Sequence, residues 1–336
     1  MHIDDIDYDL PEELIAQIPI EPRDSARLLV DQGSSEALHR RVADIGEFLH
    51  PDDLLVVNNT RVIPARLHLR RATGGAVEVL LLEPTDVQSG EWETLIRPGG
   101  KLRVGETLYG NDGVPLIEVG KRTEAGDTFV VTILVDDFET MLTERGEMPL
   151  PPYITAPLTN PDRYQTVYAR RPGSAAAPTA GLHFTKRLLQ DLQNAGVQMV
   201  TVDLTVGLDT FAPITTTNPI DHKIHTESYS VSVDTLERCR QARRVVAVGT
   251  TATRALETAA STGLIHGRSS LFITPGYDWK FVDLLITNFH MPKTSLLLMI
   301  ESFIGTRWRS LYLQAIQHKY RFLSFGDAML LDRHLE

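Results

Sequence analysis

The segment YQTVYARRPGSAAAPTAGLHFT, from Tyr164 to Thr185, combines small residues, two adjacent arginines and one histidine immediately before an expected helix. Small side chains allow a ligand to approach the backbone closely. Thr185 has the side chain of a helix N-cap, and the N–H groups at the start of a helix favour anionic or polar ligands. The segment therefore predicts a loop that binds such a substrate. The alternative is that Gly173, Pro178 and Gly181 are ordinary connector residues.

Polar residues also follow three apolar segments that have the character of buried strands. They are Asn58, Asn59 and Arg61 after residues 54–57, Gly249, Thr250, Thr251 and Arg254 after residues 245–248, and Asn288 and His290 after residues 284–287. Ligands of open α/β sheets bind beyond the carboxyl ends of the strands, so we expect these loops to converge on one cleft. For the Gly–Thr–Thr sequence a simple helix cap is an equal alternative.

The segment IDHKIHTES contains His222, His225 and Glu227, which resemble a metal-binding triad. It lacks the helical spacing of known zinc motifs, and no cysteine ligand assists. We therefore expect no metal at these residues.

Short alternating apolar runs separated by turn residues occupy the middle of the chain. They predict strands at Arg66–Leu69, Val77–Glu83, Glu91–Ile96, Leu102–Tyr109, Leu116–Val119 and Asp127–Leu134. Six strands with no long helix between them indicate a small antiparallel β-barrel, followed by a helix over Phe138–Arg145.

On both sides of this segment helices and apolar strands alternate, which predicts an α/β fold. The expected strands are Ala26–Val30, Leu54–Val57, Val197–Leu204, Val245–Val248, Leu271–Ile273 and Leu284–Ile286. The expected helices are Pro11–Gln17, Val42–Leu49, the segment from Thr185 to Gly196, Asp234–Arg243, Ala252–Ala260, Thr294–Ile304 and Arg309–His318. We thus expect a main α/β domain formed by residues 1–66 and 151–336, with residues 67–150 inserted as a β-barrel domain.

Composition restricts the class of protein. The chain has 336 residues, of which 42% are hydrophobic, enough for two domains with their own cores. A net charge of −11 argues against nonspecific coating of nucleic acid. From Leu67 to Leu150 there are 8 Lys and Arg against 15 Asp and Glu, so this segment carries −7. The pairs Arg170–Arg171 and Lys319 with Arg321 lie elsewhere and are candidates for contact with RNA phosphate.

The sequence also indicates a compartment. A single cysteine, Cys239, excludes an internal disulfide and suits a reducing environment. The acidic N-terminal residues lack the basic and apolar regions of a signal peptide, and no apolar run approaches the length of a membrane span. We expect a cytoplasmic protein without a membrane partner.

Six motifs in order resemble the S-adenosylmethionine:tRNA ribosyltransferase-isomerases of queuosine biosynthesis. They are LLVVNNTRVIPARL (Leu54–Leu67), MPLPPYI (Met148–Ile154), PTAGLHF (Pro178–Phe184), VGTTATRALE (Val248–Glu257), TNFHMPKTSLL (Thr287–Leu297) and KYRFLSFGDAML (Lys319–Leu330). Each motif is long and mixed in composition, so chance agreement of all six is far rarer than for a short glycine pattern. The resemblance spans nearly the whole chain.

The resemblance implies a specific reaction. Enzymes of this family transfer and isomerise the ribosyl part of S-adenosylmethionine onto 7-aminomethyl-7-deazaguanine at the wobble position of tRNA with a GUN anticodon. The products are epoxyqueuosine, adenine and methionine. The sulfonium makes the ribose 5′ carbon acidic and methionine a good leaving group, so a base, a proton donor for adenine and positioning suffice. No cofactor and no metal are implied, and nothing in the sequence demands more than a monomer.

The resemblance also implies roles for particular residues. His183 and His290 are the candidates for proton transfer, Glu227 is the candidate for holding the substrate amine, and His225 lines the same site. The candidates for substrate binding are Asn58, Arg61, Tyr168, Arg170, Thr179, Ala180, Gly181, Gly249, Thr250, Thr251, Arg254 and Asn288.

One segment departs from the pattern of the family. LTVGLDTF, from Leu204 to Phe211, has Thr205 and Asp209 where the family commonly has histidine and glycine. This departure leaves a second hypothesis open, a noncatalytic protein that binds tRNA or a nucleotide. An α/β hydrolase is excluded because no Gly-x-Ser-x-Gly elbow occurs.

Overall fold

The computed structural model describes residues 1–336 except for residues 34, 87–88, 124–125, 208–212 and 336. The larger part of the chain forms one nine-stranded sheet in the order β16-β14-β13-β3-β15-β17-β18-β1-β2. These strands are β1 (Arg27–Val30), β2 (Leu38–Arg41), β3 (Asp53–Asn58), β13 (Gln198–Leu204), β14 (Glu227–Ser230), β15 (Arg244–Val248), β16 (His266–Ser269), β17 (Val282–Asn288) and β18 (Ala328–Asp332). The central strands β13, β3, β15 and β17 are parallel, so their carboxyl ends share one edge of the sheet.

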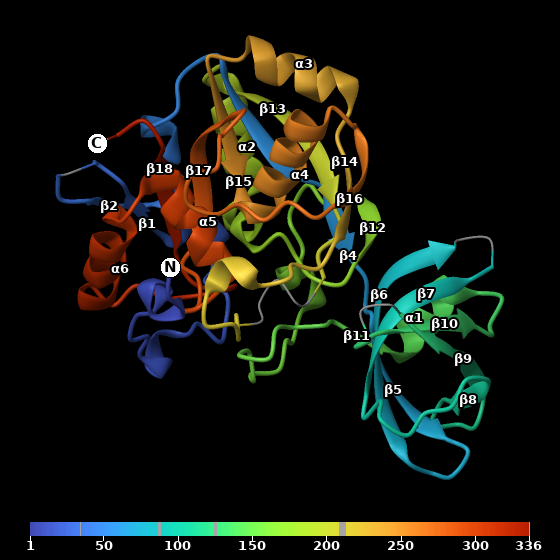
Figure 1. The fold of residues 1–336 in the computed structure, drawn as a ribbon. Coiled ribbons are helices and arrows are strands. Elements are labelled where there is room, and N and C mark those ends of the chain that lie inside the picture. The colour runs from blue at the N-terminus through green and yellow to red at the C-terminus, as the bar shows by residue number, and fades with distance from the viewer. Residues whose placement is uncertain (34, 87–88, 124–125, 208–212, 336) are drawn as a thin grey trace.

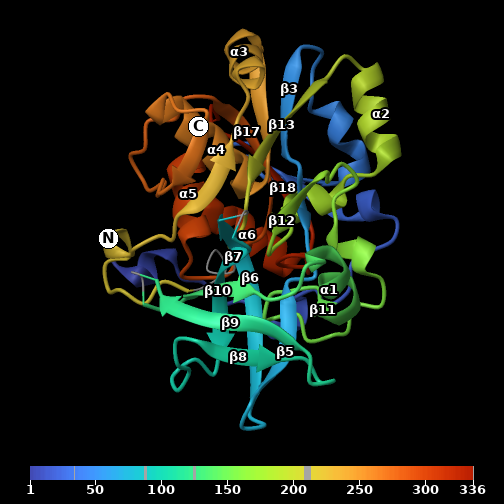
Figure 2. The same ribbon diagram turned by 90° about the vertical axis from the view of Figure 1, so that its right-hand side faces the viewer.

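Helices cover both faces of this sheet because its central strands are apolar on both faces. The helices are α2 (Lys186–Asn194), α3 (Val233–Gln241), α4 (Gly249–Thr262), α5 (Ser295–Ile304) and α6 (Arg307–Gln317). On β3, Leu54 and Val56 belong to the core that contains residues of α3 to α6, whereas Leu55 and Val57 belong to the core that contains residues of α2. Figure 2 shows α2 on one side of β3 and β13, with α4 and α5 on the other.

The middle of the chain forms a closed antiparallel β-barrel, drawn in cyan to green in Figure 1. Its strands are β5 (Arg66–Arg71), β6 (Ala76–Asp86), β7 (Glu91–Arg97), β8 (Glu106–Tyr109), β9 (Pro115–Arg122) and β10 (Phe129–Ile133). They pair in the order β5-β6-β7-β10-β9-β8, and β8 returns to β5. Their alternating inward residues, such as Leu67 and Leu69 of β5, form a separate core. The predicted α/β fold with an inserted small barrel is confirmed.

The chain enters and leaves the barrel side by side. After α1 (Phe138–Arg145), the short strand β11 (Gly146–Glu147) pairs with the first residues of β5, placing Gly146 opposite Leu67. Next to this β11–β5 pairing in the sequence, β4 (Thr60–Val62) precedes β5, and it forms a two-stranded parallel sheet with β12 (Arg171–Ser174). The domain boundaries at 66/67 and 150/151 stay a prediction.

The structure corrects several predicted elements. No strand forms at Leu271–Ile273; the strand of this region is β16, which lies just before it because it pairs with β14. Strand β8 begins only at Glu106, after a turn. The expected helix at Val42–Leu49 is a 3-10 helix over Val42–Glu47, and that at Pro11–Gln17 is a single 3-10 turn over Glu12–Leu14.

Among the described residues, the remaining short helical turns are 3-10 helices. They are Ile3–Ile6, Arg23–Ser25, Pro161–Tyr164, Thr179–His183 and Pro219–Asp221. Within the part of the chain that the structure describes, no helix is both long enough and apolar enough to cross a membrane.

Candidate functional site

A cleft of about 690 Å³ lies between the barrel and the carboxyl-end edge of the large sheet. The barrel lines it with Leu82, Glu83, Glu93, Thr123, Asp127 and Thr128, and the α/β part with residues 222–227 and 271–273 among others. Contacts between described residues of the two parts cross it. Arg268 Nη1 donates to Glu83 Oε2 over 2.6 Å, and His225 Nε2 lies 3.7 Å from Asp127 Oδ2. This volume is in the range of ordinary substrate pockets.

A buried ion pair forms one wall of the cleft. Nη1 of Arg254, on α4, donates to the carboxylate of Glu227, the first residue of β14, and both side chains are about 95% buried. Arg254 Nε donates to Leu271 O over 3.3 Å, and Glu227 Oε1 accepts from Gly207 N over 3.2 Å. Arg254 Nη2 is buried without a hydrogen-bond partner among the described residues. The predicted residues Arg254, Glu227 and His225 thus line the same cleft.

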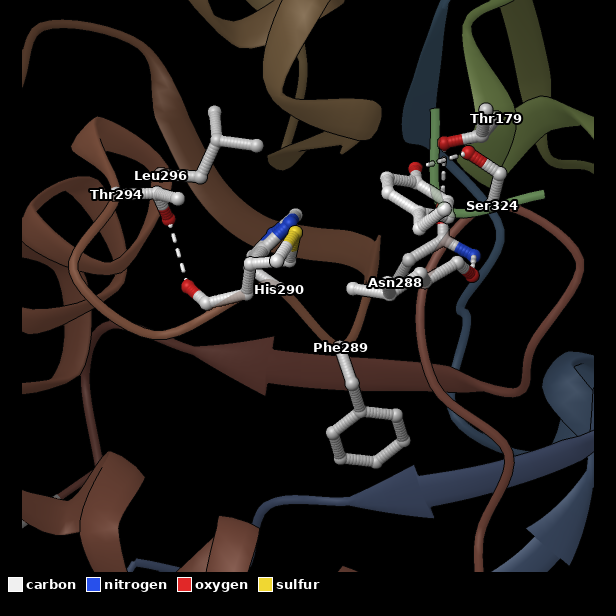
Figure 3. A pocket seen from close by; sticks show the side chains of 10 residues that line it. Thr179, Asn288, Phe289, His290, Thr294, Leu296 and Ser324 are labelled. Atoms are coloured by element: carbon white, nitrogen blue, oxygen red, sulfur yellow. Dashed lines mark hydrogen bonds between the residues drawn. The ribbon is translucent and has the colours of Figure 1, made fainter. Parts of the chain in front are cut away.

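Two small hollows adjoin the end of β17. One, of about 20 Å³, is lined by Asn288, His290, Tyr153 and Ser324 among others, and one of about 30 Å³ by Asn288, His290 and the start of α4. In Figure 3, Phe289 points away from its neighbours, because its ring packs against Tyr312 and Phe322. Leu296 lines both hollows and the large cleft, so the three spaces are neighbours.

His290 is held rigidly at its backbone. Its N–H donates to the hydroxyl of Tyr312 over 2.9 Å, and its carbonyl accepts from the hydroxyl of Tyr8. The ring nitrogen Nε2 lies 3.0 Å from Thr287 Oγ1. Burial lowers the pKa of His290 to about 3, so its imidazole is neutral at neutral pH and able to accept a proton.

His183 is equally buried, but it lines a different hollow. Its Nε2 lies 3.2 Å from Asn288 Nδ2, and the hollow that it lines with Arg23 and Arg163 does not include His290. Burial lowers the pKa of His183 to about 4; the charge of Asp327 opposes this shift, and those of Arg321 and Arg23 add to it. The two predicted proton-transfer residues therefore do not share one hollow, and Asn288 connects them.

The predicted loop around Pro178 to Phe184 forms the 3-10 helix Thr179–His183. Thr179 Oγ1 donates to Asn288 Oδ1 over 2.9 Å, and Ala180 lines the hollow beside α4. Gly181 lies under Tyr168, where an added Cβ would come within 2.1 Å of the Tyr168 hydroxyl oxygen. The requirement for glycine here is steric.

The structure unites two of the three strand-end loops. Because Val248 of β15 lies opposite Ile286 of β17, the residues that follow both strands emerge side by side. The loop after β3 is directed elsewhere. Asn58 is fully buried, and its amide exchanges hydrogen bonds with the backbone N and O of Leu204.

Two predicted binding residues, Arg61 and Arg170, lie outside these spaces. Arg61 and Arg170 are exposed, and the backbone N–H of Arg170 donates to Asn59 O over 2.8 Å. Thr205 lines the cleft, and its N–H donates to Ser228 O over 2.9 Å. Asp209 lies outside the described residues. Within the described residues, no group of three His, Cys, Asp or Glu side chains is placed to hold a metal ion.

Several residues of the site were not predicted. Tyr153 and Ser324 line the hollow of His290, and their hydroxyls are hydrogen-bonded over 2.7 Å (Figure 3). Both lie in motifs that carried the family resemblance, which was the available signal. Asp127 and Glu83 of the barrel had no such signal, because only the docking of the barrel brings them to the cleft.

Comparisons with known proteins agree with this arrangement. Residues 3–331 match the family described as queuosine biosynthesis protein. The chain is 46% identical to the S-adenosylmethionine:tRNA ribosyltransferase-isomerase of Carboxydothermus hydrogenoformans, over 98% of this chain and 100% of the relative. It is 48% identical to the protein of the same name from Symbiobacterium thermophilum, again over 98% and 100% of the two chains.

A solved structure extends the comparison. The crystal structure of an S-adenosylmethionine tRNA ribosyltransferase from Thermotoga maritima matches 97% of this chain and 99% of its own, with 36% sequence identity and a TM-score of 0.55. Fold and sequence together thus define a class of transferase and isomerase enzymes. The chain belongs to the queuosine biosynthesis family of S-adenosylmethionine:tRNA ribosyltransferase-isomerases, and the resemblance seen in its sequence is confirmed.

Proposed function

We propose that this chain transfers and isomerises the ribosyl moiety of S-adenosylmethionine onto 7-aminomethyl-7-deazaguanine at the wobble position of tRNA with a GUN anticodon. The products are epoxyqueuosine, adenine and methionine. The observation that carries the proposal is the cleft of about 690 Å³ between barrel and sheet, which adjoins the hollows of Asn288 and His290. The enzyme works in the cytoplasm as a monomer, with S-adenosylmethionine as a substrate and without a cofactor or metal.

The side chains of the site suit the proton transfers that this reaction needs. The sulfonium acidifies the ribose 5′ carbon, so an unprotonated base must stand next to it. His290 is the better-placed candidate, because it lines both hollows and burial lowers its pKa to about 3, so its ring is unprotonated at neutral pH. His183 acts through Asn288, to which it is hydrogen-bonded.

The cleft also suits a cationic acceptor amine. Glu227 is fixed by Arg254 and by Gly207 N, so its carboxylate occupies one position at the wall of the cleft. Glu93 and Asp127 of the barrel add negative charge to the opposite wall. The aminomethyl group of the modified base, a cation at neutral pH, is thereby attracted into the cleft.

Binding of the tRNA backbone requires positive charge outside the acidic barrel. Arg170 is exposed, and Arg171 is exposed although it pairs with Asp203 over 2.9 Å. Arg321 is only part-exposed and donates to Ile18 O over 3.1 Å. Arg170 and Arg171 are therefore the better phosphate contacts.

The test is release of adenine from S-adenosylmethionine by the purified chain. Release is expected with tRNA that carries the aminomethyl base and not with tRNA that carries unmodified guanine. Equal release with both would refute the proposed acceptor. Binding of the modified tRNA without any release of adenine would favour the noncatalytic alternative that the departures at Thr205 and Asp209 left open.

A further inference from the structure

Helix α4 starts without a side-chain cap. Its N-cap residue is Val248, whose side chain accepts no hydrogen bond, and the first helical residue is Gly249 with a φ of +87°. The first N–H groups of an α-helix have no partner within the helix, and their partial positive charge favours an anion. At 14 residues, α4 is long enough for this effect.

A second observation at the same place also indicates a ligand. Thr251 is 92% buried, and its hydroxyl has no hydrogen-bond partner among the described residues. This hydroxyl lies 3.7 Å from the point where a Cβ on Gly249 would stand, so it is directed back toward the first residue of the helix. An unpaired buried hydroxyl costs free energy, which a bound acceptor would recover.

The hollow in front of this helix end is neutral and small. Gly249, Thr250 and Thr251 form one side, and the residues from Ala177 to Ala180 form another. Among the residues that the structure describes, no Asp, Glu, Lys or Arg side chain lines it, so the helix end is the main source of charge that they provide. The guanidinium of Arg254, one turn further along α4, lies in the adjoining cleft.

We propose that this hollow is a carboxylate subsite, in which the first N–H groups of α4 and the Thr251 hydroxyl bind the carboxylate of the amino-acid part of S-adenosylmethionine. The inference rests on the proposed function and adds the anchoring of one group of the substrate. It places the sulfonium and ribose toward His290, which lines the same hollow.

Size favours a carboxylate over a phosphodiester of the tRNA. A water molecule needs roughly 10–15 Å³ of cavity, so about 30 Å³ accommodates two oxygen atoms but not a phosphate with its two flanking sugars. The walls are also closed to a polymer, because Thr251, Asn288 and Ala180 are each more than 90% buried. A terminal carboxylate can enter such a hollow, whereas a continuing chain cannot.

The experiment is equilibrium binding by calorimetry, which needs no turnover. The ligands are S-adenosylmethionine and decarboxylated S-adenosylmethionine, which lacks only the carboxylate. Thr251→Val removes the hydroxyl at nearly constant volume and is expected to weaken binding of S-adenosylmethionine about tenfold or more, the scale of one hydrogen bond to a charged group. Binding of the decarboxylated ligand is expected to change less than about twofold.

Two further variants separate ligand binding from folding. Thr251→Ser retains the hydroxyl and is expected to bind S-adenosylmethionine nearly as the parent does. Thr262→Val makes the same chemical change at the other end of α4, where the hydroxyl donates to Thr258 O, and is expected to leave both affinities unchanged.

Equal weakening of both ligands by Thr251→Val, or no weakening of either, would overturn the carboxylate subsite. Weaker binding of tRNA with a shallower salt dependence would overturn it in favour of a phosphodiester. Selective loss of S-adenosylmethionine binding together with absence of adenine release in the parent chain would support the subsite and refute only the proposed reaction.

Discussion

The side-chain amide of Asn288 donates to Nε2 of His183 over 3.2 Å and thereby fixes the tautomer of that buried imidazole. The orientation of the amide is set by its other partners. Its oxygen accepts from the Thr179 hydroxyl, and its nitrogen also donates to Leu323 O. Nε2 of His183 is therefore the acceptor, and the proton of the neutral ring is on Nδ1.

Replacing the amide by a carboxylate should reverse this arrangement. In Asn288→Asp a carboxylate oxygen faces Leu323 O and requires a proton on Nε2, so we expect the pKa of His183 to rise from about 4 and turnover to fall at least tenfold. Histidine NMR and the pH dependence of adenine release measure both effects. Asn194→Asp, on the exposed end of α2, is the matched control and should behave as the parent does. An unchanged pH profile in Asn288→Asp would remove Asn288 from the proton-transfer machinery.

The two buried histidines predict how stability depends on pH. Their folded-state pKa values of about 4 for His183 and about 3 for His290 lie below the ordinary value of 6.5, so the unfolded chain takes up protons first as the pH falls. The free energy of unfolding should therefore decrease from pH 6.5 downward and level off only below these pKa values, by roughly 3 kcal/mol for His183 and roughly 5 kcal/mol for His290. Urea unfolding at pH 7 and pH 5 measures the slope.

A histidine variant isolates this contribution. His290→Gln should flatten the decrease, because glutamine takes up no proton in either state. The control is His266→Gln, at an exposed position of β16, which should leave the decrease unchanged. A decrease of the same size in His290→Gln and the parent would assign the pH dependence to other groups.

The close approach of Gly181 to Tyr168 predicts a steric variant with a partial rescue. In Gly181→Ala the new Cβ would meet the Tyr168 hydroxyl at 2.1 Å, so the 3-10 helix that carries His183 must move. We expect a decrease of about 1–3 kcal/mol in the free energy of unfolding, together with slower turnover. Adding Tyr168→Phe should recover part of both, because it removes the nearest atom.

The matched control is Gly46→Ala. There the Cβ would lie at an ordinary van der Waals distance of 3.6 Å from Leu192, so stability should stay within about 0.5 kcal/mol of the parent. If Gly181→Ala unfolded at the same denaturant concentration as Gly46→Ala, the close approach of Tyr168 would not constrain the site.

The proposed contacts of Arg170 and Arg171 with tRNA phosphates can be tested by the salt dependence of tRNA binding. Arg170→Ala with Arg171→Ala should reduce the slope of log K against log salt by up to about two units, one for each phosphate that an arginine no longer neutralises. Lys101→Ala with Lys121→Ala removes the same charge from exposed positions of the barrel and should leave the slope nearly unchanged. The roles of the two parts of the chain must be exchanged if the barrel variant shows the reduced slope and the arginine variant does not.

The elements that sequence predicted best are those with a single dominant pattern. Val245–Val248 is apolar throughout and forms a central strand, and Phe138–Arg145 forms a helix with the predicted bounds. Leu271–Ile273 is just as apolar, but it lines the cleft and forms no strand. The prediction failed here because apolar residues that line a cleft have the same composition as a buried strand. Strand β18 escaped prediction because the segment Phe322–Gly326 before it follows no regular period.

The site shows the same division. His290 and the start of α4 were predicted because each directly follows a strand, and strand ends meet at one edge of the sheet. The contact of His183 with Asn288 depends on how residues 321–326 pack against the 3-10 helix at Thr179, which brings distant parts of the chain together. The same strand-end argument predicted Asn58 as a substrate-binding residue. Its amide instead forms hydrogen bonds with the backbone of Leu204 and so connects the ends of β3 and β13.

The pairing of β11 with the start of β5 has a consequence for the history of the chain. Since Gly146 lies opposite Leu67, about eighty residues of intervening sequence leave and rejoin the α/β part at nearly the same point. A gene segment of any length whose ends close on themselves could occupy this junction without altering the register of the large sheet. The barrel can in this sense be lengthened or replaced while the carboxyl ends of β15 and β17 stay as they are.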